Sequence, residues 1–447
     1  MIFRRKIYSK MLEWKQKSGG KTALLIEGAR RVGKSTIAEE FARNEYENSL
    51  TIDFSNVSQD IIDLFNNVSD LQYFFVSLQA LTGKVLKPGK SVIIFDEVQF
   101  CPKARQAIKH LVKDGRYEYI ETGSLISIKQ NIKDILIPSE ERYLNMYPLD
   151  FEEFLWAIGK EATFDLIRYS YEKLKPLGES VNREMMRLFR LYMIIGGMPQ
   201  AINEYMDGSD FSTVDDVKRD ILRLYIEDFR RIDEKGRAST IFNSIPAELA
   251  RNTLRYRVGD VIENARLSRL ESIFADLNDS KTVNFAYHAN DPGVGFALHA
   301  GYDYFKMFLA DTGLFITLAF MDRDYTDNQL YQKLLNDKLA ADLGYVYENV
   351  VSQLLVSAGH TLYYYTFRNV VDGEASTRAY EIDFLISRKD KIYPIEVKSS
   401  GYKSHKSLDE FQNKFSSRIG ARYLLYTKDL KRDGDLICLP VYMAGLL

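Results

Sequence analysis

In the first third of the chain, short apolar runs alternate with segments whose apolar residues recur at helical spacing. Short apolar runs predict strands at residues 23–27, 50–54, 91–95 and 117–121. The run SVIIF at 91–95 is continuously apolar, as expected for a strand that is buried on both faces. A helical pattern from Lys34 to about Asn44 follows the first run. Strands that alternate with helices predict a parallel sheet covered by helices on both sides.

The middle of the chain, at about residues 148–233, is mostly helical in pattern. One interruption, GGMP at residues 196–199, predicts a turn, because Gly-Gly followed by Pro breaks a helix. Residues 239–290 predict three short helices, one of them at 265–277, and then a strand at 283–288. The last quarter of the chain predicts a mixed α/β segment. It consists of a long amphipathic helix and three strands, at residues 335–358, 361–367, 380–387 and 391–398.

Composition places the chain among globular proteins. Its 447 residues are too many for one ordinary core and predict two to four domains. Hydrophobic residues make up 46% and charged residues 27%, which is typical of a folded chain rather than a disordered one. The formal net charge of -2 does not indicate a nucleic-acid-binding protein. Any contact with nucleic acid must therefore come from a local patch.

Several features predict a cytoplasmic protein without membrane attachment. The charged N-terminus lacks the apolar segment of a secretory signal, and the sequence has no apolar run long enough to span a bilayer. Cys101 and Cys438 form neither a metal-ligand pattern nor a disulfide framework, as a reducing compartment permits.

A glycine-rich turn between the first strand and the following helix has the sequence GARRVGKST. It matches the phosphate-binding pattern GxxxxGKS/T in the context that the pattern requires, and the helix N-terminus favours phosphate. Lys34 is expected to reach the β- and γ-phosphates of ATP, and the Ser35 hydroxyl to bind Mg²⁺. The predicted nucleotide-binding residues of this turn are Gly28, Ala29, Arg30, Arg31, Val32, Gly33, Lys34, Ser35 and Thr36.

A second motif, Asp96-Glu97, follows the apolar strand at 91–95. Asp96 is expected to hold the water shell of Mg²⁺, and Glu97 to polarise the attacking water, so that Lys34 and Glu97 are the catalytic candidates. A structural glycine turn and a capping aspartate would explain each motif alone. The two motifs together, at this spacing, predict an ATPase.

Other polar residues leave two interpretations open. Ser124, in the segment TGS after the strand at 117–121, is expected either to sense the γ-phosphate or to cap a helix. Arg30, Arg31 and Arg142 are candidates for stabilising the transferred charge, and a solvated surface role is the alternative for each.

A second group of candidate functional residues lies in the C-terminal segment. Asp383 in YEIDFLIS belongs to one strand, Glu396 and Lys398 in YPIEVKSS belong to the next, and a turn at 388–390 joins them as a hairpin. Because residues i and i+2 of a strand share a face, Glu396 and Lys398 point the same way. The hairpin brings Asp383 close to Glu396, and Glu348 on the preceding helix supplies a third carboxylate.

This group suits phosphodiester chemistry. Carboxylates bind Mg²⁺ or Mn²⁺, which generates hydroxide, and a lysine stabilises charge. The metal-ligand candidates here are therefore the three carboxylates, and the catalytic candidates are Asp383, Glu396 and Lys398. Residues 388–428 contain ten Lys/Arg against four Asp/Glu, which suits a phosphate backbone. The strand pattern places Ile382, Phe384 and Ile386 on the face opposite Asp383. A surface hairpin with ordinary ion pairs is the alternative to a catalytic site.

The motifs GARRVGKST, IIFDEVQ, TGS, YPLDFEEFL and GGMP, in this order, resemble those of the prokaryotic AAA-type P-loop ATPases of the AAA_14/DUF4143 family. The resemblance covers nearly the whole chain and implies an α/β fold with four parts. These are a P-loop ATPase core, a helical lid, a winged-helix-like region and an α/β domain similar to PD-(D/E)xK nucleases, at residues 1–147, 148–235, 236–330 and 331–447.

Carried over to this sequence, Asp383 matches the aspartate of the nuclease motif, Glu396 the (D/E), Lys398 the lysine and Glu348 the helix glutamate. Ile382 stands where the motif name has proline, a departure that leaves the carboxylates and the lysine in place. The stretch KMFLADTGL resembles the family's link between the winged helix and the nuclease-like domain. Residues 266–277 would then form a winged-helix helix that either reads DNA or packs against protein.

Two functions follow from the resemblance. In the first, an ATPase with ATP and Mg²⁺ as cofactors couples its nucleotide state to nucleic-acid binding, of DNA more than RNA, or to metal-dependent cleavage by the C-terminal domain. In the second, ATP only switches the arrangement of the lid and winged helix, and the C-terminal domain binds nucleic acid or a partner protein. A homo-oligomer stays open, because AAA-type ATPases often complete their site with a neighbour's arginine.

Overall fold

The computed structural model describes residues 1–124, 138–263, 265–293, 295–321, 328–336, 344–371, 374–400 and 404–447. Its contacts divide the chain into two compact units. The N-terminal unit is Met1–Tyr147 with Asp279–Lys281, and the C-terminal unit is Pro148–Asn278 with Thr282–Leu447. The predicted boundaries after residues 235 and 330 therefore both fall inside the C-terminal unit.

The N-terminal unit contains a five-stranded parallel sheet in the order β2-β3-β4-β1-β5. Its strands are β1 (Ala23–Glu27), β2 (Asn48–Asp53), β3 (Ser91–Asp96), β4 (Glu118–Gly123) and β5 (Glu141–Asn145). The four predicted strands are confirmed, with end shifts of at most two residues. No apolar run marks β5, because this strand lies at the edge of the sheet and three of its five residues are exposed.

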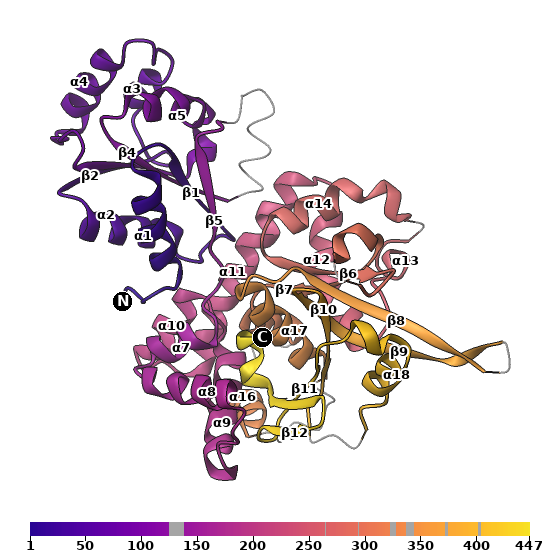
Figure 1. Cartoon of the computed structure of the whole chain (residues 1–447). Helices are drawn as coiled ribbons and strands as arrows, with labels where there is room; N and C mark the ends of the chain where they lie inside the picture. The colour runs from indigo at the N-terminus through magenta and orange to yellow at the C-terminus, as the bar shows by residue number, and fades with distance from the viewer. Residues whose placement is uncertain are drawn as a thin grey trace. The chain divides into compact units, whose positions relative to one another are not determined.

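Helices cover both faces of this sheet. Figure 1 shows α1 and α2 on one side and α3, α4 and α5 on the other. Their bounds are α1 (Ile7–Ser18), α2 (Lys34–Glu45), α3 (Gln59–Leu64), α4 (Leu71–Thr82) and α5 (Pro102–Asp114). Strand β3 is buried along its whole length, as its apolar run predicts. Phe54, Phe65 and Phe95 pack edge to face with ring centroids 5.5 to 5.7 Å apart, which anchors the end of β3 where Asp96 lies.

The C-terminal unit begins with five helices, which confirms the helical pattern of residues 148–233. They are α7 (Phe151–Ala157), α8 (Glu161–Lys173), α9 (Glu179–Ile195), α10 (Pro199–Met206) and α11 (Phe211–Ile232). The motif YPLDFEEFL starts α7 through a capping box, in which Asp150 accepts a hydrogen bond from the Glu153 N–H and Glu153 accepts one from the Asp150 N–H. The GGMP motif separates α9 from α10, and Gly196 ends α9 with a φ of 85°.

An eight-stranded mixed sheet follows, in the order β12-β13-β11-β10-β9-β8-β6-β7. Its strands are β6 (Val283–Ala289), β7 (Ala300–Leu309), β8 (Leu362–Val371), β9 (Glu374–Arg388), β10 (Lys391–Val397), β11 (Arg422–Tyr426), β12 (Lys431–Asp433) and β13 (Leu436–Pro440). Strand β6 pairs in parallel with β8, so the hairpin of the predicted winged-helix-like region and the strands of the predicted nuclease-like domain share one sheet. The long β8–β9 hairpin is drawn in orange in Figure 1.

The remaining helices are α12 (Arg237–Ala250), α13 (Val258–Val261), α14 (Glu271–Asp279), α15 (Thr312–Ala319), α16 (Asn328–Leu335), α17 (Gly344–Ser357) and α18 (Lys406–Phe415). The predicted helix at 265–277 is wrong at its start: a 3₁₀ turn at Leu267–Arg269 precedes α14. None of the helices in the described ranges is both long enough and apolar enough to cross a bilayer.

The predicted amphipathic helix at 335–358 is also corrected. Helix α17 begins at Gly344, and residues 337–343 lie outside the described residues. Its polar residues Asn349, Ser352 and Gln353 are buried rather than exposed. Asn349 accepts a hydrogen bond from the Leu309 N–H at 2.8 Å, and Gln353 accepts one from the Thr312 N–H at 2.8 Å. Because these polar side chains of α17 find hydrogen-bond partners in the interior, they do not form a solvent-exposed face of the helix.

Candidate nucleotide site and C-terminal carboxylate cluster

The glycine-rich turn connects β1 to α2 with a backbone that other residues would strain. A Cβ atom on Gly28 would lie 2.2 Å from the Met146 carbonyl oxygen, so the turn packs directly against the segment after β5. Gly33 caps α2 with a φ of 98°, and Arg31 also has a positive φ, of 70°. Ala29 and Val32 are buried, whereas Thr36 is exposed in the first turn of α2.

Lys34 points back into this turn. Its ammonium donates hydrogen bonds to the carbonyl oxygens of Gly28 at 3.1 Å and Ala29 at 3.0 Å, and the residue is 5% exposed. Burial lowers the pKa of Lys34, and attraction from Glu97 and Asp96 counteracts that effect. The lysine therefore lies within electrostatic reach of Asp96, the last residue of β3, and of Glu97 after it, as the ATPase prediction requires.

Asp96 is the meeting point of two hydroxyl groups. Ser35 Oγ donates to Asp96 Oδ1 at 2.7 Å, and the Thr122 hydroxyl donates to the same oxygen. A hydroxyl next to a carboxylate is a hard-oxygen pair of the kind that Mg²⁺ prefers. Ser35 and Asp96 therefore fit the predicted magnesium site.

Glu97 has a left-handed backbone, with a φ of 52°. Its N–H donates to the Thr122 hydroxyl at 3.3 Å, and its carboxylate accepts a hydrogen bond from the Gln99 side chain. A non-glycine residue in this conformation is strained, and such strain is concentrated at functional sites. The turn thus carries Glu97 away from the strand direction while Asp96 stays bonded to Ser35.

Two residues outside the predicted set, Thr122 and Arg5, contact this site. Thr122 contacts Asp96. Ser124, expected to sense the γ-phosphate or to cap a helix, directly precedes residues 125–137, which lie outside the described residues, so both of its roles stay predictions. Arg5 is buried and donates from Nη1 to the Val32 carbonyl at 3.0 Å and from Nη2 to the Tyr147 carbonyl at 2.5 Å. Thr122 belongs to the segment TGS, which is a local signal for it, whereas no local pattern distinguishes Arg5.

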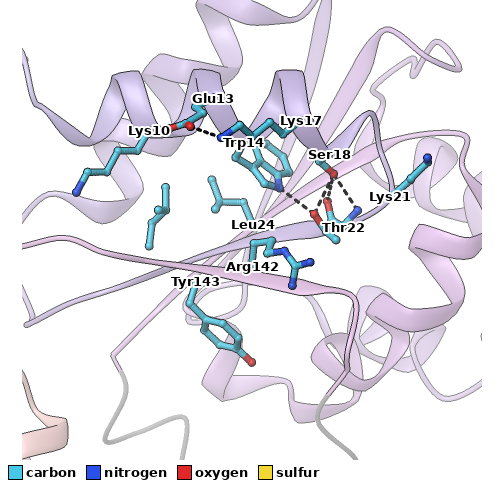
Figure 2. A pocket seen from close by; sticks show the side chains of 11 residues that line it. Lys10, Glu13, Trp14, Lys17, Ser18, Lys21, Thr22, Leu24, Arg142 and Tyr143 are labelled. Atoms are coloured by element: carbon cyan, nitrogen blue, oxygen red, sulfur yellow. Dashed lines mark hydrogen bonds and ion pairs between the residues drawn. The ribbon is translucent and has the colours of Figure 1, made fainter. Parts of the chain in front are cut away.

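Arg142 lies away from the glycine-rich turn. Figure 2 shows it on β5, in a cavity that α1 and β1 also line. The cavity has a volume of about 630 Å³, with Trp14 and Leu24 among its lining residues. Arg142 is exposed. The surface interpretation of Arg142 therefore agrees with the structure better than a role at the phosphates.

The structure brings the four C-terminal candidates together in what we call the carboxylate cluster. Asp383 Oδ2 accepts a hydrogen bond from the Val397 N–H at 2.7 Å, across the β9–β10 hairpin. Lys398 Nζ lies 2.6 Å from Glu396 Oε1. Glu348 on α17 interacts electrostatically with both Asp383 and Lys398. The structure therefore confirms that β9 and β10 form the predicted hairpin and that these four residues lie close together.

Two further residues complete the carboxylate cluster, namely Lys306 on β7 and Glu381 on β9. The Lys306 ammonium forms an ion pair with Glu381 and lies 4.0 Å from Glu348 Oε2. Burial disfavours the ammonium, but attraction from Glu381, Glu348 and Asp383 outweighs it and raises the pKa of Lys306. Burial, and then repulsion from Glu348, Glu381 and Glu396, raises the pKa of Asp383 well above its usual range.

A divalent metal ion does not fit the carboxylate cluster as it stands. Within the described ranges, no three His, Cys, Asp or Glu side chains form a group that could hold a metal ion. The carboxylates are instead engaged by Lys306, Lys398 and a backbone N–H. The metal-ligand roles of Glu348, Asp383 and Glu396 stay predictions.

The sequence contains signals for both added residues. Glu381 stands two positions before Asp383, and Lys306 is a cation beside the apolar run MFLA. The strict alternation expected for Ile382, Phe384 and Ile386 is broken. Ile382 and Leu385 belong to the same core cluster, and the β8–β9 register shifts between Tyr363 and Tyr365. A bulge of this kind redirects side chains, and bulges are frequent next to functional sites.

Comparisons with known families cover three segments of the chain. A family model described as an AAA domain (AAA_14) matches residues 20–155. Two models of domains of unknown function, DUF8612 and DUF4143, match residues 186–325 and 343–443. No curated protein matches the sequence.

Comparison with solved structures finds several similar chains. A Walker-type ATPase of Pyrococcus abyssi matches over 71% of this chain and 96% of its own, at 16% identity and a TM-score of 0.43. The ORC1 protein of Aeropyrum pernix, solved in complex with DNA, matches over 75% of this chain and 93% of its own, at 10% identity and a TM-score of 0.27. A signal transduction ATPase with numerous domains from Pyrococcus horikoshii matches over 80% of this chain and 45% of its own, at 13% identity and a TM-score of 0.27.

The AAA-domain match and the geometry around Lys34 agree. The N-terminal part of this chain is an AAA-type ATPase domain with a parallel central sheet, and the match supports ATP hydrolysis.

Proposed function

We propose that the N-terminal unit binds and hydrolyses ATP and that its nucleotide state controls nucleic-acid binding by the C-terminal unit. The observation that carries the ATPase part is the bonding of Ser35 and Thr122 to Asp96, next to a buried Lys34. These groups come from the carboxyl ends of β3 and β4 and from the first turn of α2. Their convergence is what phosphate and magnesium binding require.

Each residue has a defined role in this proposal. Lys34 leaves the carbonyl oxygens of Gly28 and Ala29 and binds the β- and γ-phosphates. Ser35 and Asp96 would hold Mg²⁺, which neutralises phosphate charge when bound. Glu97 accepts a hydrogen bond from the attacking water and aligns it, and the Thr122 hydroxyl keeps Asp96 oriented.

Nucleic-acid binding is assigned to a basic strip on α18 and the turn after it. The strip consists of Lys406, Lys414 and Arg418, all of which are exposed. Their cationic groups lie 6.0, 5.5 and 5.7 Å from the ring centroids of Tyr380, Phe367 and Phe415. Since Tyr380 and Phe367 are buried, the rings orient the cations rather than stack with bases. The strip therefore suits phosphate groups, and duplex DNA is the first ligand to test.

The test measures nucleic-acid binding of the full chain by fluorescence anisotropy. Labelled duplex DNA, single-stranded DNA and RNA are titrated with ATP and Mg²⁺, with ADP and Mg²⁺, and without nucleotide. We expect affinity to differ at least fivefold between the ATP and ADP states, and this difference to vanish in Lys34→Ala. Light scattering on the same samples reports whether copies assemble.

The triple variant Lys406→Ala/Lys414→Ala/Arg418→Ala tests the basic strip. The slope of log K against log salt should fall by roughly 2 to 3 units for duplex DNA, since each phosphate contact contributes about 0.9. The matched control removes three exposed arginines of the lid helices, Arg183, Arg187 and Arg223. Equal loss in both triple variants, or no binding in any nucleotide state, would reject the proposal. Cleavage of the probe with Mg²⁺ or Mn²⁺ would favour a nuclease instead.

A further inference from the structure

We propose that Lys306 is a protein-supplied cation that takes the place of a divalent metal ion in the carboxylate cluster. While its ammonium is present, the cluster binds Mg²⁺ or Mn²⁺ weakly, and removal of the ammonium creates a metal site. This role of Lys306 depends neither on nucleic-acid binding nor on ATP.

The backbone fixes Lys306 in position. It lies in the interior of β7, directly opposite Ala286 of β6, and β6 pairs in turn with β8. Lys306 is 6% exposed, so its side chain does not reach out to solvent as most lysines do. Its ammonium lies 5.6 Å from the centroid of the Tyr364 ring, which closes one side of the site. The lysine therefore cannot leave the cluster by a simple rotation into water.

Lys306 also uses the oxygen atoms that a metal ion would need. Glu381 forms an ion pair with it, and Glu348 Oε2 lies 4.0 Å from its Nζ. A metal ion requires several oxygens that converge on one point, free of a competing cation. A second positive charge beside the fixed ammonium would be repelled at short range. Both effects act against metal binding in the native chain.

The cluster keeps a latent capacity for a metal ion. Glu396 Oε2 is buried and has no hydrogen-bond partner among the described residues, while Glu396 Oε1 is paired with Lys398. Removal of the Lys306 ammonium takes away the cation that attracts Glu381, Glu348 and Asp383, and their carboxylates can then join this oxygen as ligands. Methionine is the substitution of choice, because it is unbranched and apolar and keeps contact with Tyr364.

The experiment measures Mn²⁺ binding by electron paramagnetic resonance on the full chain without nucleotide. The variants are Lys306→Met, Lys306→Met/Asp383→Asn and, as a matched control, Lys431→Met at an exposed position of β12. We expect the wild type and Lys431→Met to bind weakly. Lys306→Met should bind at least tenfold more tightly, and Asp383→Asn should abolish the gain.

A second variant and the wild-type titration also test the role of Lys306. Should circular dichroism show that Lys306→Met does not fold, Lys306→Leu removes the ammonium with another apolar side chain, leaves all the carboxylates in place and carries the same expectation. The wild-type titration is decisive without any variant at Lys306. Tight Mn²⁺ binding by the wild type that Asp383→Asn abolishes would overturn the proposal, as would a folded Lys306 variant that gains no site.

Discussion

The Asp311 carboxylate accepts a hydrogen bond from the Gly197 N–H at 2.5 Å, although the two residues are 114 positions apart. The second carboxylate oxygen of Asp311 accepts a hydrogen bond from the Leu314 N–H at 2.9 Å and caps α15. The N–H of Leu149 in turn donates to the Gly197 carbonyl at 2.7 Å. Three sequence motifs, YPLDFEEFL, GGMP and ADTGL, therefore meet at one point of the C-terminal unit.

This junction predicts that Gly197→Ala is strongly destabilising. A Cβ atom on Gly197 would lie 2.1 Å from the Leu149 carbonyl oxygen, so the backbone must move and the bond to Asp311 must lengthen. We expect a loss of about 2 to 4 kcal/mol in the free energy of unfolding, measured by denaturant titration. Gly259→Ala in α13 is the control, since nothing lies within 4 Å of its Cβ position. Similar stabilities of the two variants would contradict the close packing.

Glu97→Gln should separate ATP binding from hydrolysis. The amide keeps the size of the side chain but is a poor acceptor for the proton of the attacking water. We expect kcat to fall about 100-fold or more while ATP affinity stays within about threefold of the wild type. Glu40→Gln on α2 controls for the loss of a carboxylate elsewhere in the unit. A phosphate-release assay with unchanged kcat would remove Glu97 from the catalytic role.

Arg5→Ala should weaken both the fold and the nucleotide site. Arg5 joins the Val32 carbonyl of the glycine-rich turn to the Tyr147 carbonyl, and hydrogen bonds from charged groups contribute about 1.5 to 3 kcal/mol. We expect a lower melting temperature and roughly tenfold weaker ATP binding in calorimetry. Lys10→Ala, at an exposed position of α1, should change neither quantity. Normal ATP affinity in Arg5→Ala would show that the turn keeps its shape without this contact.

Two buried glutamates of the N-terminal sheet should respond to mutation in opposite ways. Glu141 forms a bidentate ion pair with Arg105, at 3.0 and 2.8 Å. Glu141→Gln should cost about 3 kcal/mol at neutral pH, because it leaves the Arg105 charge buried without its counter-charge. Glu121 is fully buried, and neither of its oxygens has a hydrogen-bond donor among the described residues.

The pH dependence of stability should identify Glu121. Burial, and then repulsion from Glu141, raises the pKa of Glu121 well above its usual range. The folded state therefore binds more protons than the unfolded state above the unfolded pKa of about 4.3, so this residue lowers stability as pH rises. Glu121→Gln should raise the melting temperature at pH 8 and leave it nearly unchanged at pH 5. A gain of equal size at both pH values would show that charge is not the cause.

Local sequence determined the elements of the nucleotide site. The glycine-rich turn, the strand before it and the helix after it are consecutive in the chain, so their residues alone fix the backbone that faces the phosphates. The same holds for the helices of residues 148–233 and for the β9–β10 hairpin, whose two strands are joined by a short turn. In these segments the partners in hydrogen bonding are close neighbours in sequence.

Only the tertiary structure decided which distant residues meet. Lys306 reaches Glu381 because β7, β6, β8 and β9 lie side by side in one sheet, an order that no local pattern encodes. Arg5 contacts Val32 and Tyr147, and α17 buries polar residues, for the same reason: their partners come from remote segments. The spacing of hydrophobic residues shows which face of one helix or strand packs against the core. The order and register of the strands in the sheet determine which residues of different elements come into contact. The sequence thus specified the ATPase turn, and the folded sheet placed a lysine among the carboxylates.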